Sequence, residues 1–174
     1  MTKFSHALKL AGLCAALALA GCETKPPAAG SAPPAEPQQQ SAPVQSSNIV
    51  PGSAEDLRVN VGDTVHFDYD KYDILDSDRA TLQRQATWFA KYPSVRVTIE
   101  GHCDERGTRE FNLALGARRA NAVKEYLVSL GVAAGRLETI SYGKERPICT
   151  ESNESCWAQN RRGVTTISGG AVSS

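Results

Sequence analysis

An acidic, an amide and a basic side chain lie at spacings that could bring them together. Asp104 follows a predicted strand, in the loop that leads into a predicted helix, and Asn112 and Arg119 are seven residues apart on that helix. With about 3.6 residues per turn, this spacing places Asn112 and Arg119 within about 20° of each other. Such a set suits a group with an ammonium and a carboxylate on one carbon. Asp104 would accept from the ammonium, Arg119 would grip the carboxylate bidentately, and Asn112 would add hydrogen bonds.

The same residues also have a plainer interpretation. An Asp and an Arg at this distance often form a solvated surface pair that contributes less than about 1 kcal/mol. Asn112 could equally be a residue that starts the helix. Gly116, between Asn112 and Arg119, favours the binding interpretation because its missing side chain leaves room for a ligand to approach the helix.

Three consecutive residues, His102, Cys103 and Asp104, suggest a Cys–His nucleophile or a metal site as an alternative. Adjacent residues at the end of a strand point to opposite faces, so His102 cannot readily activate Cys103. A zinc site needs three or four ligands at defined spacings, and the sequence has no CxxC or HxxxH motif. We therefore expect no catalytic residue, no metal and no cofactor, and we interpret His102 as a hydrogen-bonded structural histidine.

Hydrophobic periodicity predicts the elements that must position these residues. Strands are predicted in the segments 61–70, 94–101, 137–142 and 163–168, and helices over about 76–91 and 108–130. Gly131 follows the long helix where a left-handed C-terminal cap is required. Strands that alternate with helices predict an α/β fold, a two-layer sandwich in which two main helices pack on a small mixed four-stranded sheet.

The N-terminal segment resembles a secretion signal. Lys3 and Lys9 precede an apolar run of about a dozen residues, which is shorter than the roughly 20 needed to span a bilayer. The run ends in Leu-Ala-Gly-Cys22, which resembles a bacterial lipobox. Residues 1–21 are therefore predicted to be a lipoprotein signal peptide, and Cys22 the residue that receives the lipid. The alternative is an ordinary secretory signal that happens to contain a cysteine.

Residues 22–56 are predicted to be a lipidated N-terminus followed by a disordered linker. Seven of the nine prolines lie there, mixed with Ala, Gln and Ser. Because no apolar periodicity appears, the segment cannot bury enough surface to offset its ordering entropy. One folded domain is predicted over residues 57–170, followed by a tail, 171–174. The chain has 19 Lys and Arg against 19 Asp and Glu, and this balance argues against a nucleic-acid partner.

Three stretches of the predicted domain resemble a known family. They are TIEGHCDERGTREFNLALGARRANAV, SYGKERP at 141–147 and NRRG at 160–163. These motifs closely resemble the OmpA-like C-terminal domain, and the lipobox and linker narrow the resemblance to the peptidoglycan-associated lipoproteins. The resemblance implies a non-catalytic module that binds the diaminopimelate of peptidoglycan stem peptides and works with TolB and other Tol proteins. It also implies an outer-membrane lipid anchor, with Glu23 after the acylated cysteine as the sorting signal, and a folded domain in the periplasm.

The resemblance also supplies further candidate ligand residues. The family uses the segment that holds Phe67, Asp68 and Asp70 to line its ligand groove, and Asn160 and Arg161 are candidates on the same basis. One departure is Cys103, where the family usually has a small residue or threonine. An alternative to wall binding is a purely structural lipoprotein that binds another protein.

The predicted domain contains three cysteines, at positions 103, 149 and 156. An oxidising compartment favours pairing. Cys149 and Cys156 are seven residues apart in a polar stretch between the third and fourth predicted strands, where a hairpin-like loop could bring them together. We predict a Cys149–Cys156 disulfide, with Cys103 as a buried free thiol that behaves as a small hydrophobe, and we expect neither to have a role in ligand binding. The alternative is three reduced thiols.

Overall fold

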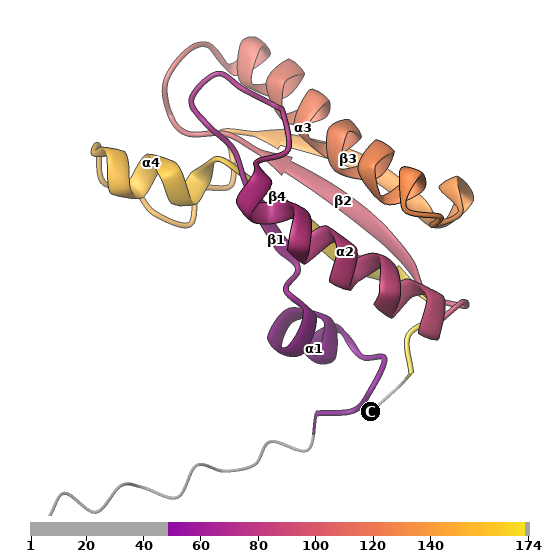
Figure 1. Cartoon of the computed structure of the whole chain (residues 1–174). Coiled ribbons are helices and arrows are strands. Elements are labelled where there is room, and N and C mark those ends of the chain that lie inside the picture. Colours follow the sequence, from indigo (N-terminus) through magenta and orange to yellow (C-terminus); the bar gives the residue numbers. More distant parts are fainter. Residues whose placement is uncertain (1–48, 173–174) are drawn as a thin grey trace, which may run out of the picture. The chain divides into compact units, whose positions relative to one another are not determined.

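The structure is a computed structural model that describes residues 49–172 (Figure 1). The predicted signal peptide, Cys22 and the linker up to residue 48 lie outside the described residues, as do residues 173–174 of the tail. In the described part, no helix has the length and apolar character needed to cross a membrane.

Helices and strands alternate along most of the described chain. The helical elements are α1 (Ala54–Asp56), the π-helical turn η1 (Leu57–Val61), α2 (Asp76–Lys91), α3 (Arg109–Ser129), the 3₁₀ turn η2 (Ala134–Arg136) and α4 (Glu154–Asn160). The strands are β1 (Thr64–His66), β2 (Arg96–His102), β3 (Leu137–Gly143) and β4 (Arg162–Gly169).

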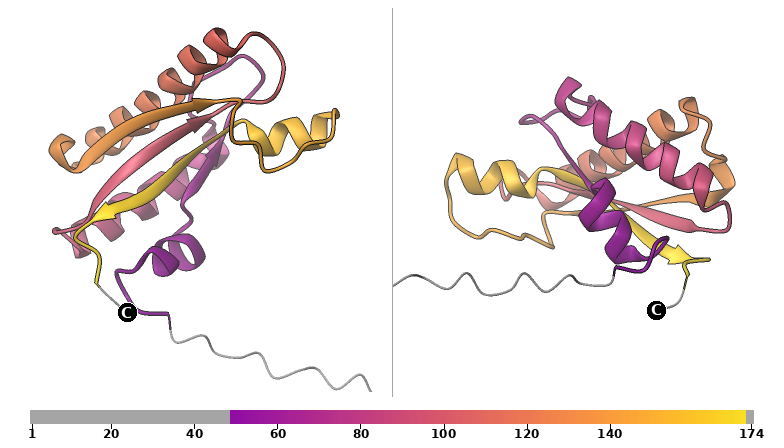
Figure 2. Two further views of the ribbon diagram at one scale, coloured as in Figure 1. Left: turned by 180° about the vertical axis from the view of Figure 1, so that it is seen from behind. Right: turned by 60° about the horizontal axis from the view of Figure 1, so that its bottom comes forward.

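The four strands form one mixed sheet in the order β1-β4-β2-β3. Strand β4 is antiparallel to both β1 and β2, whereas β2 and β3 are parallel. Helices α2 and α3 cover one face of this sheet (Figures 1 and 2). The predicted α/β two-layer sandwich, with two main helices on a small mixed four-stranded sheet, is therefore confirmed.

The core lies between this sheet face and the two helices. Its fully buried side chains include Leu82 and Phe89 from α2, Val97 and Ile99 from β2, and Leu127 from α3. Burial of such side chains contributes about 1.5–3 kcal/mol each. Gly131 has φ 95° directly after the C-cap of α3, which confirms the predicted left-handed position.

Two glycines set the closest approach of α3 to the sheet. A Cβ on Gly101 of β2 would overlap the carbonyl of Gly116, and a Cβ on Gly116 would collide with Ser141. The backbones of β2 and α3 therefore nearly touch. This contact brings the end of β2, which leads to Asp104, beside the N-terminal half of α3, which carries Asn112 and Arg119.

Folded structure begins earlier in the chain than the predicted boundary at residue 57. Asp56 is 8% exposed, and its carboxylate accepts hydrogen bonds from the Gly52 N–H and from Nε1 of Trp88, both at 2.8 Å. Residues 52–56, which were assigned to the linker, therefore pack on α2. The prediction of a linker was wrong for these residues. They are held by hydrogen bonds to the Asp56 side chain, and such bonds leave no apolar periodicity in the sequence.

Two other elements differ from the sequence prediction. The first strand is shorter, because Val61 ends the helical turn η1 and β1 spans only Thr64–His66. The stretch around the disulfide is not only a loop, since it contains α4. Asn153 caps α4 by accepting a hydrogen bond from the Cys156 N–H at 2.9 Å. Such a polar seven-residue helix has no apolar stripe to signal it.

Candidate functional site

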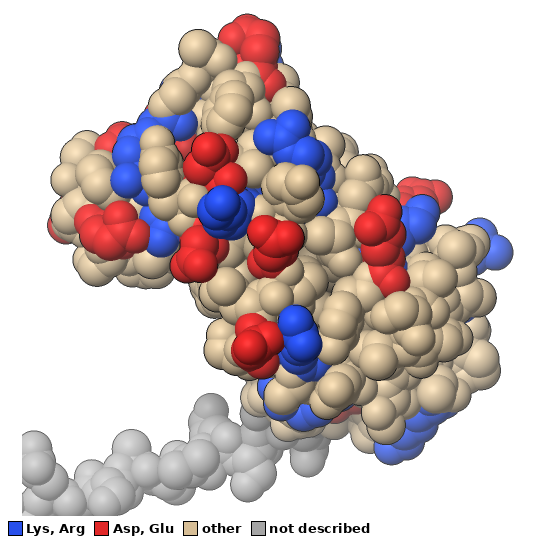
Figure 3. All heavy atoms as spheres, turned by 45° about the horizontal axis from the view of Figure 1, so that its top comes forward, with Lys and Arg blue, Asp and Glu red and all other residues tan. Residues whose placement is uncertain are grey.

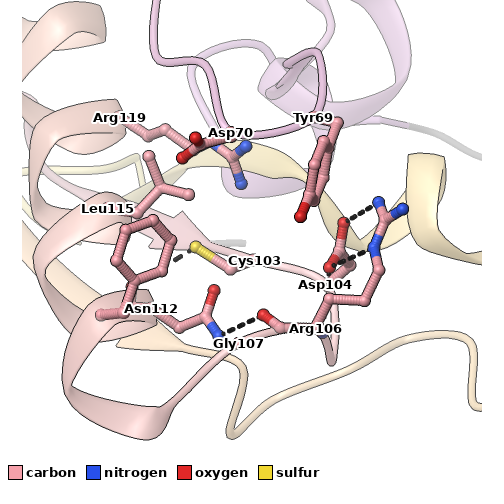
Figure 4. A pocket seen from close by; sticks show the side chains of 10 residues that line it. Tyr69, Asp70, Cys103, Asp104, Arg106, Gly107, Asn112, Leu115 and Arg119 are labelled. Atoms are coloured by element: carbon pink, nitrogen blue, oxygen red, sulfur yellow. Dashed lines mark hydrogen bonds and ion pairs between the residues drawn. The ribbon is translucent and has the colours of Figure 1, made fainter.

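A pocket of about 70 Å³ lies at the N-terminal end of α3 (Figure 4). Four of the predicted ligand residues, Asp70, Asp104, Asn112 and Arg119, line it together. The other lining residues are Tyr69, Cys103, Arg106, Gly107, Phe111 and Leu115. The structure thus brings the predicted acid, amide and guanidinium to one place.

Arg119 forms one side of the pocket and is only 1% exposed. Its Nε donates to the carbonyl of Lys71 at 2.8 Å, Nη1 to that of His102 at 2.8 Å, and Nη2 to that of Asp68 at 3.0 Å. A guanidinium has five N–H donors, so these bonds leave one N–H on each terminal nitrogen. Burial lowers the pKa of Arg119 from its ordinary value, but an arginine remains a cation. The three carbonyls fix the orientation of this cation.

Asp104 is 4% exposed, and both of its oxygens accept hydrogen bonds. Oδ1 accepts from the backbone N–H and Nε of Arg106, both at 3.1 Å. Oδ2 accepts from Nη2 of Arg106 at 2.6 Å and from Nη1 of Arg161 at 3.4 Å. Burial acts to raise the pKa of Asp104, but the bonds from Arg106 outweigh burial and lower the pKa. A carboxylate has about four acceptor positions, so a ligand ammonium must replace one of these donors.

Arg106 is the main pocket residue that the sequence analysis missed. Its guanidinium lies between two aromatic rings, 4.0 Å from the centroid of Tyr69 and 4.0 Å from that of Trp157. Figure 4 shows it beside Asp104, with Tyr69 standing next to them. A signal was present, since an Asp in a loop often accepts from the backbone N–H two residues on, and this bond brings the basic side chain at that position close to the carboxylate.

Asn112 has a structural role at the start of α3, and it also lines the pocket. Its Nδ2 donates to the carbonyls of Arg106 at 2.8 Å and Thr108 at 3.0 Å, so it fixes the loop that starts α3. Its side chain also lines the pocket (Figure 4). Cys103 lines the same pocket, and its Sγ donates to the Asn112 carbonyl at 3.3 Å. Burial raises the pKa of the Cys103 thiol, so the thiol stays protonated at neutral pH.

Phe67, Asp68 and Asp70 contribute to the site in different ways. Asp70 lines the pocket and has φ 56°, the left-handed region that Asp tolerates better than most residues. Phe67 is buried, and its ring centroid lies 5.1 Å from Cζ of Arg119. The side chain of Asp68 is exposed, whereas its backbone carbonyl holds Arg119. Phe67 and Asp68 therefore do not line the pocket, but both contact Arg119 and help to hold it in position.

Neither Asn160 nor Arg161 is among the lining residues. Arg161 lies behind Asp104, where Nε donates to the Phe67 carbonyl at 2.9 Å and Nη2 to Oε1 of Glu154 at 2.6 Å. The Asn160 side chain accepts from the N–H groups of Ile148 and Cys149 and donates to the Cys149 carbonyl. Arg161 therefore supports the Asp104 carboxylate from outside the pocket, and Asn160, at the end of α4, bonds to the backbone beside the disulfide.

His102 differs from the expected hydrogen-bonded histidine. Both ring nitrogens are buried and, within the described residues, lack a hydrogen-bond partner. Nε2 lies 3.4 Å from Oε2 of Glu100 without hydrogen-bond geometry. Burial and the nearby cation Arg162 lower the pKa of His102 to about 4, so the ring is neutral at pH 7. Among residues 49–172, no group of three or more His, Cys, Asp or Glu side chains is arranged to hold a metal ion.

The predicted disulfide is present in the structure. Cys149 and Cys156 are bonded, with their Cα atoms 5.2 Å apart, and Cys103 is free and buried. Charges of both signs are mixed on the face shown in Figure 3, where Lys and Arg side chains are interspersed with Asp and Glu. This mixture agrees with a pocket in which Asp70 and Asp104 face Arg106 and Arg119.

Known proteins resemble this chain in sequence and in fold. The OmpA family matches residues 66–161. A peptidoglycan-associated lipoprotein of Agrobacterium fabrum is 46% identical over 175 residues, 99% of this chain and 94% of the relative. One of Rhizobium meliloti is 60% identical over 119 residues, 68% of each chain. Both relatives are named as lipoproteins, not as enzymes.

Solved structures show the same fold. The peptidoglycan-associated lipoprotein from Burkholderia pseudomallei is 43% identical with a TM-score of 0.59, covering 60% of this chain and 89% of that one. The C-terminal domain of Helicobacter pylori MotB is 25% identical with a TM-score of 0.57, covering 62% of this chain and 84% of that one. The chain therefore belongs to the OmpA family and, within it, to the peptidoglycan-associated lipoproteins.

Proposed function

We propose that this domain binds the diaminopimelate residue of peptidoglycan stem peptides in the pocket between Asp104 and Arg119. The observation that carries the proposal is that a buried carboxylate and a buried guanidinium line one pocket of about 70 Å³. The free end of diaminopimelate has an ammonium and a carboxylate on one carbon, which are the complementary charges. The volume suits the end of a side chain rather than a whole peptide.

In this proposal, Arg119 and Asp104 bind opposite ends of the charged group. The two remaining N–H groups of Arg119 donate to the ligand carboxylate. The ammonium donates to Asp104 after displacing a donor, and the bond from Arg161, at 3.4 Å, is the longest of the four. Asn112 and Asp70 supply further acceptors at the lining. Charge-assisted hydrogen bonds of this kind contribute about 1.5–3 kcal/mol each.

The proposal extends to a tether between the outer membrane and the wall. Cys22 is the proposed lipid attachment site, which holds the chain on the outer membrane with the domain in the periplasm. About 30 residues of linker would reach roughly 30 Å as a random coil and up to about 90 Å when extended. We propose TolB and other Tol proteins as partners, so that the protein acts in the Tol-Pal system in envelope integrity and cell division. The family membership supports this part.

The direct test is binding to isolated sacculi with matched competitors. The chain with Cys22→Ser, from which the lipid is absent, should be retained by sacculi. An L-Ala-D-Glu-diaminopimelate tripeptide should release it, whereas the tripeptide with lysine in third place, whose side chain ends in an ammonium alone, should not. Equal release by the two tripeptides would contradict recognition of the zwitterion. No retention at all would favour a lipoprotein that binds another protein instead of the wall.

A further inference from the structure

We propose that the Cys149–Cys156 disulfide is a positioning element for the ligand pocket. It holds α4 in place, and α4 in turn orients the two arginines that fix Asp104. The proposal rests on the proposed function only for its binding readout, because the orientation of Asp104 can be measured without a ligand.

Helix α4 contacts Arg106 through two side chains. The ring of Trp157 stacks on the Arg106 guanidinium at 4.0 Å, and Oε2 of Glu154 lies 3.8 Å from Nη1 of Arg106. The indole Nε1 of Trp157 also donates to Oε1 of Glu105 at 2.9 Å. The helix therefore holds both residues that follow Asp104 in the chain.

The second arginine on Asp104 belongs to α4 itself. Arg161 is the C-cap residue of α4, and its Nη2 donates to Glu154 in the first turn of the helix at 2.6 Å. Its Nη1 reaches Asp104 at 3.4 Å. All four donors to the Asp104 carboxylate therefore come from residues that α4 carries or contacts.

Helix α4 depends on tertiary support. It is seven residues long, and helices of that length are marginal without such support. Cys156 lies within the helix with 0% exposure, and the disulfide joins it to Cys149 in the preceding loop. The other restraints on this loop are noncovalent, and they include the hydrogen bonds between Asn160 and the backbone at 148–149, that of the Asn153 cap and that from Arg162 to the Arg146 carbonyl. Closing a short loop covalently removes chain entropy from the alternatives to this arrangement.

Loosening α4 should therefore weaken ligand binding without unfolding the domain. Arg106 and Arg161 would sample other positions, and the Asp104 carboxylate would lose its fixed orientation. A site whose charged groups must be ordered by the ligand binds more weakly than one that is already ordered. Neither cysteine is among the lining residues, so the effect is indirect.

The test compares the disulfide-bonded chain with the Cys149→Ser/Cys156→Ala variant, in which alanine avoids a hydroxyl at the buried position. In carboxyl-carbon NMR titrations, Asp104 should titrate at higher pH in the variant, because its bonds from Arg106 lower its pKa. The indole N–H signal of Trp157 should move or broaden, whereas that of Trp88, bonded to Asp56 in the core, should not. Affinity for the diaminopimelate tripeptide should fall about fivefold.

Two controls separate positioning from general destabilisation. Val132→Ala removes core volume at the far end of α3 and should leave the Asp104 titration unchanged, although it lowers the unfolding temperature. In an Arg106→Ala background, breaking the disulfide should weaken binding less than it does in the unaltered chain, because α4 then acts on Asp104 through Arg161 alone. Trp157→Ala keeps the disulfide and should reproduce the Asp104 shift, which covers the case in which the cysteine variant does not fold.

An unchanged Asp104 titration in both the cysteine variant and Trp157→Ala would overturn the proposal. Tighter binding after loss of the disulfide would also overturn it, since Arg106 would then compete with the ligand instead of orienting Asp104. If the disulfide-bonded chain does not bind the tripeptide at all, the proposed function fails, and the NMR titration still decides whether the disulfide positions Asp104.

Discussion

The guanidinium of Arg106 grips the carboxylate of Asp104 in the ligand-free pocket, with Nη2 at 2.6 Å from Oδ2 and Nε at 3.1 Å from Oδ1. Asp104 is therefore already paired with a cation before a ligand binds. A ligand ammonium can bind to Asp104 only by displacing one of the present donors. Exchange limits the net gain from the ammonium, because one charge-assisted bond is lost for each that forms. The carboxylate end of the ligand, which meets the two N–H groups of Arg119 that donate to no backbone carbonyl, should then contribute more to affinity.

Asp104→Ala should weaken sacculus binding by at least tenfold. Without the carboxylate, the ligand ammonium would lie beside the cations of Arg106 and Arg161 with no acceptor, and an unsatisfied buried polar group costs about 1–3 kcal/mol. Sedimentation with isolated sacculi measures the effect. Asp76→Ala, at an exposed acid in the first turn of α2, is the control and should bind normally. Normal retention of Asp104→Ala would remove this residue from the ligand site.

Arg119→Lys should weaken binding about tenfold while the charge is kept, because an ammonium cannot donate to three carbonyls and also grip a carboxylate bidentately. Lysine is preferred to alanine here, since alanine would leave the carbonyls of Asp68, Lys71 and His102 without this donor. Titration calorimetry with the diaminopimelate tripeptide is the measurement. Arg118→Lys, one position earlier and exposed, is the matched control. Equal affinities for the two variants would contradict the bidentate role.

His102 should make the domain less stable as the pH falls from about 6.5 to about 4. Its pKa is about 4 in the folded state against 6.5 in the unfolded chain, so the unfolded state binds the proton first in this window. The free energy of unfolding should fall by about 3 kcal/mol across it. Urea unfolding at a series of pH values measures the slope. His102→Asn should flatten it, and His66→Asn, at an exposed histidine, should not. A slope that survives in His102→Asn would assign it to other groups.

Cys103 should react slowly with alkylating reagents, because the thiol is buried and its raised pKa keeps the thiolate scarce. Without reductant, the mature folded chain should take up one label on urea denaturation, and Cys149 and Cys156 should appear in one linked fragment. Mass spectrometry under non-reducing conditions reads both results. A fragment that links Cys103 to either partner would contradict this assignment.

Cys22→Ser should release the protein from membranes, because the proposed acylation requires the thiol. Fractionation of lysozyme-treated cells measures this without the contribution of the wall. Cys14→Ser, within the predicted signal peptide, is the control and should still fractionate with the outer membrane. A Cys22→Ser protein that remains with the membrane after wall digestion would show that another anchor holds it.

The regular elements and one half of the site could be predicted from the sequence alone. The boundaries of α2 were predicted to the residue and those of α3 to within one, because both helices combine an apolar stripe with recognisable ends. Asp104, Asn112 and Arg119 could be grouped because the turn after β2 and the pitch of α3 are local features. The Cys149–Cys156 pair also followed from local spacing.

Only the tertiary structure decided how these residues are held. Arg119 bonds carbonyls about 50 positions earlier in the chain, and Asp104 receives Arg161 from 57 positions later. The buried carboxylate of Asp56 accepts a hydrogen bond from Trp88, 32 residues later in the chain. Periodicity and helical pitch report only on neighbours along the chain, whereas buried polar groups take their partners from whichever segment the fold brings within hydrogen-bond distance. The sequence by itself therefore determined the layers and the pair of opposite charges, and packing decided that Arg106 pairs with Asp104 in the free pocket.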